Sequence, residues 1–240
     1  MRILTASLLG TALGAVLLSG CSEGPADAEA AEPAPRAAAM QETQDTEPLT
    51  PSEVAADADM EDEANPLAEL PAGDYVLEKT HAYVTFSYSH GGLSNPILRF
   101  LDFDATATVN PDTPEDSRLT VTIDPASIDS AVEAFDTHLK SPDMFDVANH
   151  PQITFVSTGL TMESPDSGTL TGDLTMKGIT KPVTLDVVLN GAGQNREGLP
   201  AFGISATGQL DRSEWDLGYA APFVGTDVDL RIEAEFQQAG

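Results

Sequence analysis

Val228-Asp229-Leu230-Arg231-Ile232-Glu233-Ala234-Glu235-Phe236 is the stretch of sequence that decides the fold of this chain. Apolar and charged side chains alternate along it, and this period of two is the pattern of a β-strand with one buried and one solvated face. Turns such as Asn110-Pro111-Asp112 and Lys177-Gly178 separate further runs of the same kind. Those runs cover residues 75–77, 84–90, 103–109, 119–123, 153–155, 169–176, 183–190 and 202–210. Such strands predict an antiparallel sandwich or barrel of about eight or nine strands.

One segment of this all-β pattern has a helical period instead. Its apolar residues recur at helical spacing, and they are Ile128, Ala131, Val132, Phe135 and Leu139. Asp124-Pro125 stands upstream, where proline suits a first helical turn, and Ser141-Pro142 stands downstream, where proline ends a helix. We predict one inserted amphipathic helix over about 127–140, whose apolar face plugs one end of a barrel or covers a sheet.

The N-terminus has the pattern of an exported lipoprotein. An apolar segment from Ile3 to Leu18 is too short for a comfortable membrane span but suits a signal peptide. It ends in Leu18-Ser19-Gly20-Cys21, a lipobox in which small residues precede the cysteine that takes the lipid. We expect residues 1–20 to be a signal peptide with this lipobox, and Cys21 to carry acyl chains such as palmitate. Cys21 is the one cysteine of the sequence, so an intramolecular disulfide is excluded.

The residues after the lipobox have the composition of a disordered leash. Between Ser22 and Ala72 there are 14 acidic residues and one basic residue, with many Ala and Pro and few β-branched or aromatic residues. Such a segment buries too little apolar surface to offset its chain entropy. We therefore expect residues 21–72 to be a lipid-anchored, acidic, disordered tether and residues 73–240 to be the barrel domain.

The charge of the chain narrows its partners and its location. A net charge of −28 repels phosphate backbones, which excludes nucleic acid as a partner, and it disfavours adsorption to anionic lipids. The lipid anchor predicts a membrane-bound protein of the periplasm. Ser22 follows Cys21, without an aspartate to signal retention in the inner membrane, and this favours the inner face of the outer membrane.

No catalytic set stands out in the sequence. The four histidines are His81, His90, His138 and His150, and no pair has the close helical spacing of a zinc enzyme. No G-x-S-x-G motif occurs, and the cysteine is taken by the lipid. We expect Arg212 to pair locally and Trp215 to cover one end of the barrel. The sequence thus predicts neither an enzyme, nor a metal site, nor a cofactor.

Several motifs, in order along residues 73 to 237, resemble those of the YceI-like family of bacterial periplasmic proteins. They are Thr80–Phe86, His90–Ser94, Ser127–Ser130, Asp136–Asp146, Pro151–Phe155, Gly172–Val183, Arg212–Trp215 and Val224-Gly225. The resemblance implies an eight-stranded lipocalin-like barrel with a helix, which binds the tail of a long isoprenoid such as a polyprenyl lipid or a quinone. Asn95-Pro96 departs from the glycine usual in this loop and leaves the choice of headgroup open.

The resemblance also turns apolar strand positions into candidate ligand contacts. Since an eight-stranded barrel encloses at most one small ligand, inward-facing apolar residues would line its cavity. The candidates are Phe86, Phe103, Phe155, Leu185, Val187, Phe202, Ile204, Leu230 and Ile232. His81 and His90 flank one strand and are candidates for holding the headgroup.

Other readings remain open at this point. Without the resemblance, the same apolar residues are simply core, and the barrel is a ligand-free module for protein interaction or stress response. A lipid-modifying enzyme lacks a catalytic set. An outer-membrane pore disagrees with the charged strand faces and with a C-terminus lacking a terminal aromatic residue. The sequence does not give the oligomeric state, and a homodimer is one of the arrangements left open.

Overall fold

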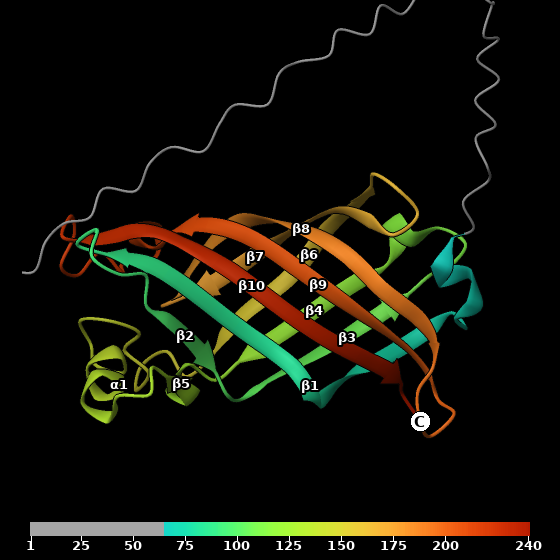
Figure 1. Ribbon diagram of the computed structural model, residues 1–240, viewed down its shortest axis with the longest axis horizontal. Helices are drawn as coiled ribbons and strands as arrows, with labels where there is room; N and C mark the ends of the chain where they lie inside the picture. Colours follow the sequence, from blue (N-terminus) through green and yellow to red (C-terminus); the bar gives the residue numbers. More distant parts are fainter. Residues whose placement is uncertain (1–64) are drawn as a thin grey trace, which may run out of the picture. The chain divides into compact units, whose positions relative to one another are not determined.

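Ten strands, one α-helix and four 3-10 helices make up residues 65–240, the part of the chain that the computed structural model describes (Figure 1). The strands are β1 (Gly73–His90), β2 (Ile97–Phe100), β3 (Phe103–Val109), β4 (Arg118–Ile123), β5 (Ile128–Asp129), β6 (Ile153–Met162), β7 (Ser167–Met176), β8 (Ile179–Gln194), β9 (Pro200–Asp211) and β10 (Val224–Gln238). The helices are η1 (Pro66–Glu69), η2 (Pro114–Asp116), η3 (Pro125–Ser127), α1 (Glu133–Leu139) and η4 (Arg212–Trp215). Within these residues, no helix combines the length and the apolar character that a membrane crossing needs.

The sheet closes on itself as an eight-stranded antiparallel barrel. Its strands follow in the order β10-β9-β8-β7-β6-β4-β3-β1, and β1 also pairs with β10. Strands β2 and β5 extend the sheet beyond β1 as a short flap, because β2 pairs with the second half of β1 and β5 pairs with β2. The predicted lipocalin-like barrel with an inserted helix is confirmed. Closure removes the exposed sheet edges that an open sheet of this size would carry.

The alternation read from the sequence correctly gives the inward face of β1 and β10. Phe86 pairs with Leu230 and Tyr88 pairs with Val228, so these side chains share the interior, whereas Thr85 and Arg231 pair on the outer face. The two strands shift register between Glu78 and Tyr83. This irregularity, a β-bulge in character, re-aims the side chains that it contains.

The helix is shorter than predicted. It covers Glu133–Leu139, whereas Ile128–Asp129 forms β5 and Pro125–Ser127 is a 3-10 turn. Ala131 has a φ of 62°, a left-handed conformation that no α-helix continues through. The Asp136 carboxylate accepts hydrogen bonds from the backbone and hydroxyl of Ser130, which fixes this break just before the helix. The prediction of about 127–140 was therefore wrong at its start, since local hydrogen bonds overrode the apolar period.

The folded region begins before Gly73. Residues 66–69 form η1, and Leu70 is 4% exposed in a core cluster with Tyr75 and Phe236. The last residues assigned to the tether are therefore part of the barrel domain. The signal peptide, Cys21 and the rest of the tether, up to residue 64, lie outside the described residues.

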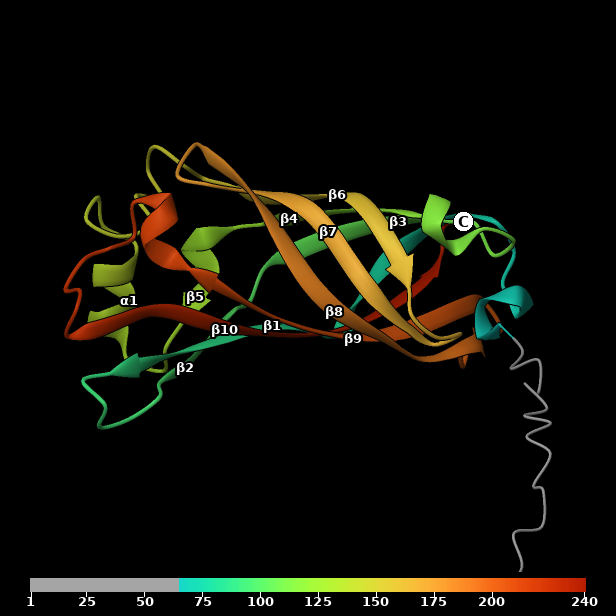
Figure 2. The same cartoon turned by 90° about the horizontal axis from the view of Figure 1, so that it is seen from above.

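The two ends of the barrel carry different elements. Helix α1 and strands β2 and β5 gather at one end, and η1 and the C-terminus lie at the other (Figures 1 and 2). The core accordingly divides into two clusters, one containing Leu139, Phe145 and Trp215, the other containing Leu70 and Phe236.

Candidate functional site

An apolar cavity of about 720 Å³ occupies the end of the barrel that carries α1. Strands β1, β2, β7, β9 and β10, the helices α1 and η4 and four loops contribute to its wall. The lining residues are Phe86, Tyr88, His90, Ser94, Pro96, Ile97, Leu98, Phe100, Ser130, Val132, Phe135, His138, Leu139, Met144, Phe145, Met176, Leu210, Arg212, Leu217, Tyr219, Ala220, Phe223, Val224, Val228 and Leu230. None of them is Asp or Glu, although the chain has 39 acidic residues. This wall suits an uncharged, largely apolar ligand.

Inward-facing rungs of neighbouring strands build one side of the cavity. Tyr88 on β1 lies opposite Val228 on β10, which in turn lies opposite Leu210 on β9. One step deeper, Phe86 lies opposite Leu230. Phe135 and Leu139 of α1 also line the cavity, which agrees with the first of the two predicted places for its apolar face, one end of the barrel.

A packed layer of side chains closes the floor of the cavity. Its members face inward from β4, β6, β7, β8, β9 and β10, and none lines the cavity: Val121, Ile153, Phe155, Leu174, Val183, Leu185, Ala206 and Ile232. Two glycines make room in this layer. A Cβ at Gly172 would lie 2.3 Å from the Phe155 ring, and one at Gly208 would lie 2.6 Å from Leu185. The floor is therefore filled by close packing over bare backbone.

A second cavity of about 120 Å³ lies beyond this floor, at the η1 end. Its lining includes Leu67, Val187, Phe202, Ile204 and Phe236. Phe202 stacks on Phe236 with ring centroids 5.0 Å apart. The interior is thus one large cavity and one small cavity, with a packed layer between them.

The candidate lining residues fall into four groups along the barrel. Phe86 and Leu230 line the large cavity. Phe155, Leu185 and Ile232 lie in the floor, and Val187, Phe202 and Ile204 line the small cavity. Phe103 lies beside neither cavity; it borders a hollow next to the β1 bulge. Alternation gave the inward face of these strands but not the depth of each residue along the barrel axis.

The two candidate headgroup histidines lie in different places. His90 lines the large cavity at the end of β1, where its ring packs edge-on against Phe223 at 5.3 Å. His81 lies in the β1 bulge, exposed on the outer wall, and does not line the cavity. Ala82 is buried and continues the inward face of Phe86 and Tyr88, so His81, one residue before it, falls on the outer face.

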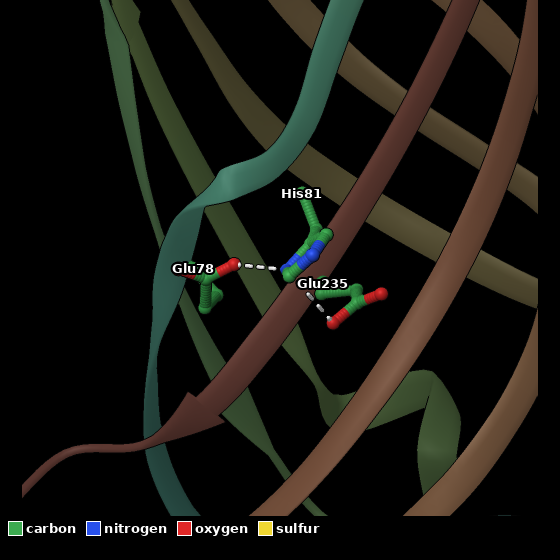
Figure 3. A group of neighbouring side chains, drawn as sticks. All are labelled: Glu78, His81 and Glu235. Atoms are coloured by element: carbon green, nitrogen blue, oxygen red, sulfur yellow. Dashed lines mark hydrogen bonds and ion pairs between the residues drawn. The ribbon is translucent and has the colours of Figure 1, made fainter. Parts of the chain in front are cut away.

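His81 instead forms a surface cluster with two carboxylates (Figure 3). Its Nδ1 lies 2.6 Å from Glu78 Oε2 and 3.7 Å from Glu235 Oε2. Within residues 65–240, this is the one group of three or more His, Cys, Asp and Glu side chains close enough to share a metal ion. The Thr80 hydroxyl also donates to the Glu78 carboxylate at 2.8 Å. The contacts present make this cluster a solvated ion pair.

Glu78→Gln is expected to reveal this pair as a small, pH-dependent contribution to stability. The Thr80 hydrogen bond, followed by His81, lowers the pKa of Glu78 below 4.5. The contribution, under ~1 kcal/mol for a surface pair, is therefore full above that pH and is lost as pH falls through the lowered pKa. Urea unfolding at neutral and acidic pH measures it. A difference between the variant and wild type that grows on acidification would contradict this assignment.

Arg212 organises the loop that forms one side of the mouth. Arg212 is 7% exposed. Four of its N–H groups donate hydrogen bonds to the backbone carbonyls of Leu217, Tyr219, Val224 and Gly225. Burial lowers the pKa of Arg212. Burial also raises the pKa of Tyr88, and the nearby positive charge of Arg212 offsets part of this rise. No carboxylate of the described residues lies within 4.0 Å of Arg212. The predicted local pairing is thus to backbone.

Trp215 anchors the same turn against the barrel. It is 1% exposed, and its Nε1–H donates to the Leu174 carbonyl at 3.1 Å. This agrees with its expected role in covering one end of the barrel. Together, Arg212 and Trp215 fix residues 212–225 between the floor layer and the mouth.

Sequence reasoning missed most of the loop-borne part of the cavity. The apolar residues of Leu217–Val224 stand outside any period and carry no signal of their own. Tyr88 shares the alternation of Phe86 and carried the same signal for the inward face. Phe135 and Leu139 were identified as the apolar face of a helix, without assignment to the ligand.

Comparison with known proteins links this barrel to a family. A model of the YceI-like domain matches residues 75–236. Protein YceI of Escherichia coli O157:H7 is 36% identical over 166 residues, which cover 68% of this chain and 86% of the relative. The match spans the whole barrel, from β1 to β10.

Solved structures share the fold. The crystal structure of the Campylobacter jejuni YCEI protein is 28% identical, with a TM-score of 0.58, over 62% of this chain and 88% of that one. The polyisoprenoid binding domain from Saccharophagus degradans is 12% identical, with a TM-score of 0.51, over 70% of this chain and 100% of that one. Since the latter is matched over its full length, the barrel is a folding unit in its own right.

Proposed function

The chain belongs to the YceI-like domain family, and from this membership we propose that its barrel binds a single long isoprenoid lipid of the polyprenyl or quinone type. The observation that carries the proposal is the cavity of about 720 Å³ whose wall is apolar and free of carboxylates. The polyisoprenoid binding domain that shares this fold takes, by its name, a ligand of this class.

The volume of the cavity fits part of a long tail. An apolar protein cavity of about 150 Å³ holds benzene, or about 25 Å³ per carbon atom. At that ratio, 720 Å³ accommodates about 29 carbons, or between five and six isoprene units. Transfer of the tail from water to the cavity supplies about 0.8 kcal/mol per buried methylene, which is a large gain over many carbons. The net affinity is therefore limited by the cost of ordering the tail.

The polar groups of the wall favour an uncharged headgroup. Tyr88, His90, His138, Arg212 and Tyr219 are the larger polar side chains of the lining. Arg212 has four of its five N–H groups committed to backbone carbonyls. Little donor capacity is therefore left for a diphosphate, whereas the Tyr88 hydroxyl and a histidine suffice for a quinone carbonyl or an alcohol.

The N-terminal anchor would keep this barrel at a membrane. We propose that Cys21 carries the lipid, that the acidic tether links it to the barrel, and that the protein works at the periplasmic surface, on the inner face of the outer membrane. Tethering raises the effective concentration of the barrel near its lipid source. Carriage or storage of the isoprenoid follows from this placement.

Phe86→Asp is expected to abolish copurification of the lipid. A carboxylate in an apolar wall must be desolvated when the tail enters, which costs more than the tail gains there. Residues 65–240 are produced in a bacterial periplasm and purified without detergent, and the organic extract is analysed by mass spectrometry. The wild type should yield about one isoprenoid per barrel.

Thr85→Asp is the matched control. It introduces the same charge one residue away, on the outer face opposite Arg231, and should leave the lipid in place. Circular dichroism establishes that both variants fold. Equal lipid content in both variants would contradict the proposed site. An empty wild-type extract, even after refolding with added isoprenoid, would favour the ligand-free interaction module.

A further inference from the structure

Five exposed apolar side chains surround the mouth of the large cavity. Leu93, Ile97, Val132, Tyr219 and Phe223, here called the mouth rim, are between 52% and 83% exposed. The described residues contain ten exposed large apolar side chains, and six of these are at least 52% exposed; five of the six form the mouth rim. Exposed apolar groups that cluster in this way mark an interaction surface.

The mouth rim is also free of charge. Residues 82–98, 130–132 and 217–226 contain no Asp, Glu, Lys or Arg, in a chain of which 21% is charged. The strongly acidic surface begins again at Glu133 and Asp227. Charge is thus absent from the three segments that carry the mouth rim.

The rim is continuous with the cavity and held in place by the fold. Ile97, Val132, Tyr219 and Phe223 are rim residues that also line the cavity. The Gly91 amide donates to the Phe223 carbonyl at 2.9 Å, which joins two rim loops. Arg212 fixes the loop that carries Tyr219 and Phe223. The surface is therefore preformed around the opening through which a ligand passes.

We propose that the mouth rim is a membrane-docking surface, which enters the interfacial layer of a zwitterionic bilayer so that the isoprenoid passes directly between bilayer and cavity. This inference rests on the proposed lipid binding. An uncharged apolar rim with a Tyr and a Phe suits the interface between headgroups and acyl chains. The net charge of −28 disfavours anionic lipids, so apolar insertion is the attraction.

The position of the chain start makes such docking useful. The tether would join the barrel at η1, at the end opposite the rim (Figure 2). The 18 residues of β1 span at most about 60 Å, whereas the 45 residues from Cys21 to Asn65 could reach at most about 150 Å. A tether of that length, as proposed above, would let the mouth turn to the bilayer without fixing the orientation of the barrel. The rim supplies that orientation.

The test compares vesicle binding by a rim variant and by a matched variant. Residues 65–240 are floated with phosphatidylcholine vesicles. Leu93→Asp/Ile97→Asp is expected to reduce the partition coefficient at least tenfold, since burial of one such side chain corresponds to more than a tenfold factor. Val188→Asp/Leu199→Asp removes exposed apolar side chains away from the mouth and should bind like the wild type. Anionic lipid added at low salt should weaken wild-type binding, and salt should restore it.

Lipid content separates this proposal from the binding function. Leu93 is the rim residue that does not line the cavity, so Leu93→Asp alone should load isoprenoid from vesicles at least tenfold more slowly, and its extract at equilibrium should match the wild type. Vesicle binding by barrels that never contain isoprenoid would leave docking intact and overturn the proposed function. Equal binding by both variants, no binding by a lipid-loaded wild type, or a wild-type dimer that the rim substitutions dissociate would overturn membrane docking.

Discussion

Arg212→Met is expected to lower the free energy of unfolding of the barrel by about 3–5 kcal/mol, because four backbone carbonyls lose a charged hydrogen-bond donor. Arg212 is 7% exposed, and its guanidinium donates to four backbone carbonyls in residues 217–225. Methionine fills much of the same space but donates no hydrogen bond. Each carbonyl left buried without a donor costs about 1–3 kcal/mol, and the loop reduces this sum only by opening to water. Urea unfolding of residues 65–240 measures the difference.

Two further variants identify the cause of this loss. Arg212→Lys keeps the charge but has one nitrogen, which cannot reach four carbonyls around a planar fork, so it should recover only part of the stability. Arg231→Met removes an arginine whose side chain is 74% exposed, and it should cost under ~1 kcal/mol. Faster hydrogen exchange in 217–225 of the Arg212→Met variant would show that this loop is what the guanidinium holds. Full recovery by lysine would contradict the hydrogen-bond account.

The fold was readable from the sequence because alternation reports a local physical constraint. A strand with Val228, Leu230 and Ile232 on one face and Asp229 and Arg231 on the other can bury only the first face. This constraint held along β1 and β10, and closure of the barrel followed. It did not give the register shift between Glu78 and Tyr83, because no feature of the sequence marks a bulge.

The site was readable only in part because its depth is a property of the closed barrel. Phe86, Phe155 and Phe202 all face inward, yet one lines the large cavity, one fills the floor and one borders the small cavity. The stagger of strands around a barrel sets these levels, and a single strand does not contain it. The loop from Leu217 to Val224 completes the mouth, and the hydrogen bonds from Arg212 hold it there. No hydrophobic period in the sequence marks this loop.

Phe155→Ala is expected to lengthen the bound isoprenoid. Phe155 packs over Gly172 in the floor between the two cavities, and its loss joins the cavity of about 720 Å³ to the cavity of about 120 Å³. The small cavity alone adds room for about five carbons, or one isoprene unit, at about 25 Å³ per carbon. The substitution should also lower the free energy of unfolding of the empty barrel by about 3–5 kcal/mol, as large-to-small changes in a packed core do.

Mass spectrometry of the extracted lipid, after loading from a mixture of isoprenoids of several lengths, measures this shift. Phe103→Ala is the matched control, because it removes an aromatic ring that borders neither cavity and should leave the length distribution unchanged. A longer ligand regains part of the lost stability, since its added unit fills the joined space. A Phe155→Ala barrel that is destabilised but selects the wild-type lengths would mean that the tail ends before the floor. Chain length would then be set at the mouth, by the contacts of the headgroup.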